Sequence, residues 1–180
     1  NLRQTWKYRV ENNEITNIKS TASRYVQDQA GTLVTSAVSQ RLDYSDVDSK
    51  LYPTDGYVAW LDTELAGVGG DAQYISGKIG GVYYYPVADG WVLSTLGETG
   101  VVAGYGGSNV RINERFFVGG TNLRGFEKSG IGPRDLGTDD ALGGNRFYRG
   151  SVELKFPIGL PDDMGVAGHA FTDAGSLWGI

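Results

Sequence analysis

The feature that most constrains this sequence is an alternation of apolar and polar residues that recurs along nearly the whole chain. Successive side chains of a β-strand point to opposite faces, so the alternation predicts strands with one apolar and one polar face. The first segment shows it most clearly, because apolar Leu2, Trp6 and Tyr8 share one parity while charged Lys7 and Arg9 share the other. The pattern therefore predicts an all-β fold.

Segments with this alternation cover 2–11, 32–44, 57–65, 73–87, 91–103, 146–158 and 166–175. Most of them reach about ten residues, the length that a tilted strand needs to cross a bilayer, whereas strands of soluble proteins average about five or six. We therefore predict membrane-spanning strands. A soluble β-sandwich is the structural alternative, and it would usually have shorter strands and a less aromatic outward face.

The connections between the predicted strands are of two kinds. Short turns with Pro and Gly are predicted at 52–56, 86–90 and 157–165, and longer connections at 12–31, 66–72 and 104–145. Tight turns at one end and long loops at the other are typical of a membrane barrel. Within the first long connection, 20–29 is predicted as one short helix, with Ser20 or Thr21 as its N-cap and Gly31 after its end.

Composition narrows the classes of function. The formal net charge of -5 and the pI near 4.8 argue against a nucleic-acid partner. The chain has no cysteine, which excludes a disulfide framework and a thiolate metal site. No apolar run approaches the roughly 18 residues of a membrane-spanning helix. The 28 glycines and 11 tyrosines suit strands, turns and the boundary between lipid and water.

The number of predicted strands leads us to expect a fragment. An up-and-down bacterial barrel closes with an even number of strands, and open edges in hydrocarbon leave backbone groups unpaired. We therefore expect residues 1–180 to be one partial domain, incomplete at both ends. Its strands would be about seven consecutive strands of an antiparallel up-and-down transmembrane β-barrel, with a long loop at 104–145.

Residues that suggest an enzyme are scarce. The only histidine, His169, shares a strand parity with Asp173, yet no Gly-x-Ser-x-Gly elbow or reactive thiol accompanies it. Two pairs of neighbouring aspartates, 139–140 and 162–163, have the chemistry for a hard cation or for acid/base catalysis, but we expect solvated loop charge there. We therefore predict no catalytic residue, no metal and no cofactor, and keep an all-β hydrolase as an alternative.

The most informative stretch is 116–126, Phe-Phe-Val-Gly-Gly-Thr-Asn-Leu-Arg-Gly-Phe, followed at 130–135 by Gly-Ile-Gly-Pro-Arg-Asp. These residues resemble the long sixth loop of the BamA family of outer-membrane barrels, with its signature Val/Leu-Arg-Gly-Phe and trailing Gly-Pro. Pro-Thr-Asp-Gly at 53–56, Ala-Leu-Gly-Gly-Asn at 141–145 and Phe-Thr-Asp-Ala-Gly at 171–175 also match the family, in its order. The resemblance therefore extends over most of the chain.

This resemblance implies the seventh to thirteenth of about sixteen strands, a number within the range of such barrels. It also implies a function, the folding and insertion of β-barrel proteins into the bacterial outer membrane, without chemistry on covalent bonds. The implied partners are unfolded outer-membrane proteins, outer-membrane lipids and accessory lipoproteins. The autotransporter-assembly barrel TamA and two-partner secretion translocators carry similar loops, so they remain alternatives, as does a passive porin-type barrel.

The resemblance further implies that the long loop folds back into the lumen, where Arg124 meets Glu153 and Asp173 on the wall. Strand parity independently places Glu153 on a polar face with Arg149 and Lys155. A guanidinium is well shaped to bridge two carboxylates. The alternative is that Arg124 is a solvated loop charge, because surface ion pairs contribute little.

The functional loop motif is therefore predicted to be Leu123-Arg124-Gly125-Phe126. Within it, Gly125 would let the backbone turn closely, and Phe126 would wedge the tip in place. Supporting loop residues are predicted at Gly119, Gly120, Gly132 and Pro133.

Overall fold

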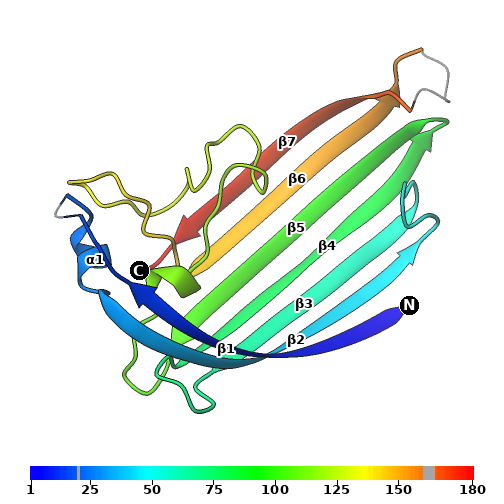
Figure 1. Ribbon diagram of the computed structural model, residues 1–180. Helices are drawn as coiled ribbons and strands as arrows, with labels where there is room; N and C mark the ends of the chain where they lie inside the picture. Colours follow the sequence, from blue (N-terminus) through cyan, green and yellow to red (C-terminus); the bar gives the residue numbers. More distant parts are fainter. Residues whose placement is uncertain (20, 160–164) are drawn as a thin grey trace.

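The computed structural model describes residues 1–19, 21–159 and 165–180. These residues form one sheet of seven strands in the order β1-β2-β3-β4-β5-β6-β7 (Figure 1). The strands are Leu2–Ile15 (β1), Gly31–Val47 (β2), Gly56–Ala66 (β3), Tyr74–Ala88 (β4), Trp91–Gly104 (β5), Arg146–Pro157 (β6) and Ala167–Trp178 (β7). Each strand pairs antiparallel with the next one along the chain. The predicted all-β, up-and-down architecture is confirmed.

The strands are long enough to span a bilayer. They run from 11 residues in β3 to 17 in β2, and at about 3.3 Å per residue even a tilted strand of this length covers most of a hydrocarbon core of about 30 Å. The connections before β2, β4 and β6 lie at one end of the sheet, and those before β3, β5 and β7 lie at the opposite end (Figure 1). The predicted asymmetry is confirmed for the connections 16–30 and 105–145, whereas the connection 67–73, predicted to be long, is no longer than the turn 48–55 at the other end.

One face of the sheet is apolar and exposed. The pairing register places Leu42 beside Leu61, and Leu61 beside Ile79, so apolar side chains line up across neighbouring strands. Trp6 and Ile79 on this face are 63% and 57% exposed. A continuous apolar surface of this kind is unfavourable in water and suits contact with lipid. The other face carries the charged residues and the long loop.

The first strand is longer than its sequence pattern indicates. The predicted connection 12–31 is wrong in its first part, because Asn12 and Asn13 lie in β1 opposite Val34 and Leu33. Asparagine is a poor strand former on its own, and here pairing with β2 overrides that preference. β1 continues to Ile15 and β2 begins at Gly31, so the loop between them covers only 16–30.

The predicted short helix is present but is only a single turn. It covers Arg24–Gln27 (α1), and the side chain of Ser23 caps it by accepting a hydrogen bond from the backbone N–H of Tyr25 at 3.2 Å. The expected cap at Thr21 is therefore wrong, and the alternative cap, Ser20, lies outside the described residues, as do Asp162 and Asp163 and the middle of the turn 157–165. In the part of the chain that the structure describes, no helix is long and apolar enough to cross a membrane.

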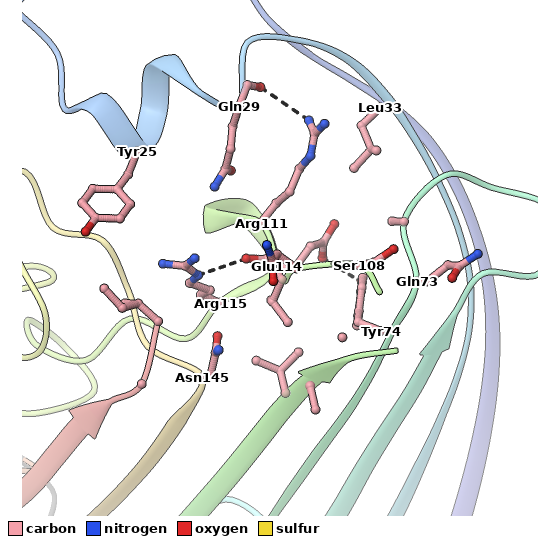
Figure 2. A pocket seen from close by; sticks show the side chains of 18 of the residues that line it. Tyr25, Gln29, Leu33, Gln73, Tyr74, Ser108, Arg111, Glu114, Arg115 and Asn145 are labelled. Carbon is pink, nitrogen blue, oxygen red and sulfur yellow. Dashed lines mark hydrogen bonds between the residues drawn. The ribbon is translucent and has the colours of Figure 1, made fainter. Parts of the chain in front are cut away.

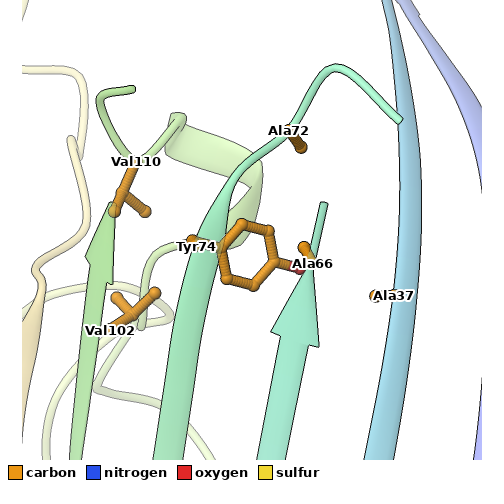
Figure 3. Packing of buried hydrophobic residues seen from close by; sticks show 6 residues of the cluster. All are labelled: Ala37, Ala66, Ala72, Tyr74, Val102 and Val110. Carbon is orange, nitrogen blue, oxygen red and sulfur yellow. The ribbon is translucent and has the colours of Figure 1, made fainter. Parts of the chain in front are cut away.

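Buried apolar residues form two clusters, and both involve the long loop between β5 and β6. The base cluster consists of Ala37, Ala66, Ala72, Tyr74, Val102 and Val110 (Figure 3). The tip cluster consists of Val118, Leu123, Phe147 and Leu177. In both, loop side chains pack on the polar face of the sheet. A β-sandwich would place a second sheet there, so the structure contradicts that alternative within the described residues.

Candidate functional site

The long loop, residues 105–145, is folded back on itself. It contains a short 3-10 helix, Ile112–Glu114 (η1), and backbone bridges that join Phe116 to Gly144 and Val118 to Ile131. It contacts both β1 to β4 and β6 to β7 from the same face of the sheet, so that face is concave around the loop (Figure 1). We call this concave side the lumen.

Glycines and a proline support the fold of the loop at the predicted positions. A side chain at Gly119, which has a φ of 129°, would place its Cβ 2.2 Å from the carbonyl oxygen of Glu127. Gly132 has a φ of 113°, and a Cβ there would lie 2.5 Å from the side chain of Leu177 on β7. Backbone hydrogen bonds join Gly120 N–H to the Phe126 carbonyl at 3.0 Å and Leu142 N–H to the Pro133 carbonyl at 2.9 Å.

The guanidinium of Arg124 binds the Asp173 carboxylate with two parallel hydrogen bonds. Nε donates to Oδ2 and Nη2 donates to Oδ1, each at 2.8 Å. The backbone N–H of Arg124 also donates to Oδ2, at 2.9 Å. Fork-shaped pairing of this kind fixes both distance and orientation, so Asp173 on β7 determines where the tip of the loop lies.

Three further wall groups complete this site, which we call the Arg124 clasp. Nη1 of Arg124 donates to Glu153, and Nη2 donates to Ser151 Oγ at 2.7 Å. The Arg124 guanidinium carbon lies 3.5 Å from the ring centroid of Phe171, a cation–π distance. Ser151 pairs with Asp173, and Glu153 with Phe171, in the register of β6 and β7, so adjacent strands present all four groups.

The clasp is a partly buried cluster of charge. The side chains of Arg124, Glu153 and Asp173 are 35%, 25% and 6% exposed. Hydrogen bonds and charge from Asp173 first, and from Glu153 next, raise the pKa of Arg124 above its ordinary value. Arg124 therefore keeps its positive charge, and removing it would leave two carboxylates facing each other.

His169 and Asp173, which share a strand parity, have different partners in the structure. Nδ1 of His169 lies 2.8 Å from Glu153 Oε1, whereas both carboxylate oxygens of Asp173 accept hydrogen bonds from Arg124. His169 is thus a neighbour of the clasp. Within residues 1–19, 21–159 and 165–180, no group of three or more His, Asp or Glu side chains is placed to hold a metal ion.

Leu123 is the residue that wedges the loop tip against the wall. Its side chain is 1% exposed and packs in the tip cluster, whereas Phe126 is 47% exposed. Among the described residues, the motif side chain that packs on the wall is therefore Leu123, and the predicted role of Phe126 stays a prediction. Gly125, which has a φ of 87°, gives the backbone between Arg124 and Phe126 a left-handed conformation that favours glycine.

Sequence reasoning missed a second guanidinium at the tip, which reaches from the wall to the loop. Arg149 on β6 donates from Nη1 to the Asn122 carbonyl at 2.8 Å and from Nε to Glu98 at 2.7 Å. Trp60 Nε1 donates to the other oxygen of Glu98 at 3.1 Å. The strand parity of Arg149 indicated that its side chain faces the lumen. No pattern in the sequence indicated that it would bind the backbone carbonyl of Asn122.

The loop between β1 and β2 docks on the long loop. The hydroxyl of Ser23 donates to Asp135 at 2.6 Å, and its backbone N–H donates to Asp140 at 2.9 Å. The hydrogen bond from Ser23 lowers the pKa of Asp135. Asp139, the other member of the predicted pair, lies 3.3 Å from Arg134 within the long loop. These aspartates thus serve contacts within and between loops.

A cavity of about 1070 Å³ lies beneath this loop contact, between α1, the long loop and the ends of β4 and β5 (Figure 2). On one side, Arg111 donates to the Gln29 carbonyl at 3.5 Å. On another, Arg115 donates to the carbonyls of Val110 and Leu142 at 3.2 Å and 3.1 Å, and burial lowers its pKa. The two loops together cover this end of the lumen.

Comparison with known proteins gives one family. The Omp85 superfamily domain matches residues 1–180. The outer membrane protein assembly factor BamA of Neorickettsia risticii (strain Illinois) is 35% identical over 180 residues, which are 99% of this chain and 24% of that protein. BamA of Neisseria meningitidis serogroup B is 35% identical over 137 residues, 73% of this chain and 17% of that protein.

The match extends to a relative from a mouse and to a solved structure. The sorting and assembly machinery component 50 homolog of Mus musculus is 31% identical over 167 residues, covering 89% of this chain and 35% of that protein. The crystal structure of BamA from Haemophilus ducreyi lacking POTRA domains 1–3 superposes with a TM-score of 0.76 at 25% identity, over 82% of this chain and 31% of that chain. The present chain thus spans about a quarter of the length of its first relative.

Proposed function

Since this chain belongs to the Omp85 superfamily, we propose that it forms part of the barrel of an outer-membrane protein assembly factor, which folds other β-barrel proteins and inserts them into the membrane. The membrane is the bacterial outer membrane, in keeping with the relatives named BamA and the all-β fold. The substrates are unfolded outer-membrane proteins. Outer-membrane lipids and accessory lipoproteins are the other partners, and no nucleic acid or cofactor takes part.

The Arg124 clasp is the observation that carries this proposal. A barrel for passive diffusion needs an open lumen, whereas here a loop of some 40 residues is fixed in the lumen by a bidentate ion pair whose carboxylate is 6% exposed. Breaking a buried ion pair by removing one partner is strongly unfavourable. The loop therefore remains docked, and the wall around it keeps a defined shape.

Assembly of this kind needs no chemistry on covalent bonds. In our proposal, substrate strands pair with a strand edge of the complete barrel, as extended segments add to exposed sheet edges elsewhere. The seven strands described supply the lipid-facing wall and the latched loop. We propose accordingly that the protein is not an enzyme and that His169 only supports Glu153.

Reconstitution tests the proposal. The full-length protein and its Arg124→Ala variant are placed in lipid vesicles and given an unfolded barrel protein, and the folded fraction is followed by its heat-dependent gel mobility. We expect the wild type to accelerate folding and Arg124→Ala to slow it. Arg24→Ala is the matched control, because Arg24 is exposed in the other loop.

A wild-type protein that fails to accelerate folding would overturn the assembly function. A stable, solute-selective conductance without such acceleration would favour a passive transport barrel. Secretion of a dedicated partner protein without acceleration of barrel folding would favour a two-partner translocator.

A further inference from the structure

The long loop contacts the wall at a second polar site, at the opposite side of the sheet from the Arg124 clasp. The carboxylate of Glu114 in η1 lies 2.7 Å from the hydroxyl of Tyr74 on β4 and 3.6 Å from Nη2 of Arg9 on β1. The hydroxyl of Thr35 on β2 donates to its other oxygen at 3.4 Å. Three strands thus surround one loop carboxylate.

The loop side chain of this second site is better shielded from water than the loop side chain of the clasp. The side chain of Glu114 is 9% exposed, compared with 35% for Arg124. Tyr74 and Thr35 are buried, and the ring of Tyr74 lies in the base cluster beside Val110 of the loop (Figure 3). A buried carboxylate is tolerated only where it is paired and hydrogen-bonded, so these partners hold Glu114 at this position.

We propose that Glu114 is a second positioning residue of the long loop, which spans the lumen as a strut between two anchors. The base anchor is Glu114 with Arg9, Thr35 and Tyr74, and the tip anchor is the Arg124 clasp. Phe116 lies between them and packs against both the base and the tip clusters. The strut holds the β1 to β4 wall at a fixed separation from β6 and β7. Its importance for assembly rests on the proposed function, whereas the contacts of the base anchor do not depend on that function.

The hydrogen bonds of the base anchor predict which substitutions it tolerates. The hydroxyl of Tyr74 has one hydrogen, yet it lies 2.6 Å from Glu64 and 2.7 Å from Glu114. Arg9 also donates hydrogen bonds to Glu64, at 3.0 Å, and to Glu11. Three carboxylates therefore surround one guanidinium. The Tyr74 oxygen also accepts a hydrogen bond from Nη2 of Arg9 at 2.9 Å, which leaves it one further lone pair. An amide at position 114 would donate to that lone pair, while an alanine would remove every contact.

Hydrogen exchange of the full-length protein in lipid nanodiscs tests the two anchors separately. Backbone bonds from Glu114 and Phe116 to Arg111 and Gly144 report on the base, and the bond from Gly120 to the Phe126 carbonyl reports on the tip. For Glu114→Ala we expect about tenfold faster exchange at the base, with little change at the tip, because a hydrogen-bonded charge is lost locally.

Two other variants separate positioning from general destabilisation. Tyr74→Phe keeps the ring in the base cluster and removes the hydroxyl, and it should open the base as Glu114→Ala does. Glu114→Gln should keep the base closed. In the control Glu127→Ala the lost side chain is 77% exposed, and exchange at both ends of the loop should stay as in the wild type.

The double variant Glu114→Ala with Tyr74→Phe should open the base by less than the sum of the two single effects, because the two changes share the contact between Glu114 and Tyr74. Unchanged exchange in Glu114→Ala, or equal acceleration at base and tip, would overturn the proposal, as would a Glu114→Gln variant that behaves like the alanine. Folding assays on the same variants then report on function separately. If the base opens and assembly activity is unchanged, the base anchor has no role in assembly, although its structural role in positioning the loop stands.

Discussion

Replacing Arg124 by alanine perturbs one defined set of contacts. It removes the two hydrogen bonds to Asp173, the bonds to Glu153 and Ser151, and the cation–π contact with Phe171. Glu153 and Asp173 then face each other across the vacated position without a cation between them. The backbone bond from residue 124 to Asp173 and the packing of Leu123 are left to hold the tip.

The size of the effect follows from the burial of the three side chains. Removing one partner of a fully buried ion pair costs about 3–5 kcal/mol. Arg124 and Glu153 are 35% and 25% exposed, so water screens part of the interaction, and we expect about 2–3 kcal/mol of tip docking to be lost. That loss corresponds to an opening equilibrium larger by about 30-fold to 150-fold.

The opening of the loop tip can be measured by native-state hydrogen exchange. Exchange of residues 118–126 would be followed in the full-length protein in lipid. Arg124→Lys should lie between wild type and alanine, because an ammonium keeps the charge but loses the fork-shaped pairing. Adding Asp173→Asn to Arg124→Ala should recover part of the protection by relieving repulsion. An Arg124→Ala tip that exchanges as slowly as the wild type would refute the reasoning, as would an equally large effect of the exposed control Arg24→Ala.

Three further outcomes are expected. Gly132→Val combines a φ of 113° with a Cβ 2.5 Å from Leu177, so it should destabilise the docked loop by about 1–3 kcal/mol, measured by loop proteolysis. The hydrogen bond from Ser23 lowers the pKa of Asp135. The contact between the two loops should therefore be complete above the ordinary aspartate pKa of about 3.9 and be lost as the pH falls through the lowered value, which spin-label distances between the loops over a series of decreasing pH values would show. Ile79→Arg places a charge on the lipid face and should cost about 2–4 kcal/mol near the midplane, measured by urea unfolding in lipid.

The strands could be predicted from the sequence because each carries its own alternation. From Tyr57 to Leu65, for example, parity alone separates the exposed apolar residues from Asp62 and Glu64, and no distant partner is needed to read it. Boundaries were less predictable where pairing overrides local preference, as at Asn12 and Asn13, which join β1 because β2 lies opposite.

The loop was predictable only in part. Its motif pointed to Arg124, the parity of Glu153 pointed to the wall, and the family resemblance pointed to Asp173. Which side chain of the motif would be buried could not be read from the sequence, because it depends on the direction of the backbone around Gly125. That direction buries Leu123 and exposes Phe126. Contacts to backbone groups, such as that of Arg149 with the Asn122 carbonyl, leave no pattern in a single sequence.

A double-mutant cycle between Arg124 and Asp173 tests the latched loop most directly. Hydrogen exchange at the tip would be measured for wild type, Arg124→Gln, Asp173→Asn and the double variant, with the full-length protein in lipid. The docked loop predicts that the two changes are non-additive, with a coupling energy of about 1–3 kcal/mol. Strictly additive effects would mean that the two side chains do not meet in the lumen, and would contradict the account.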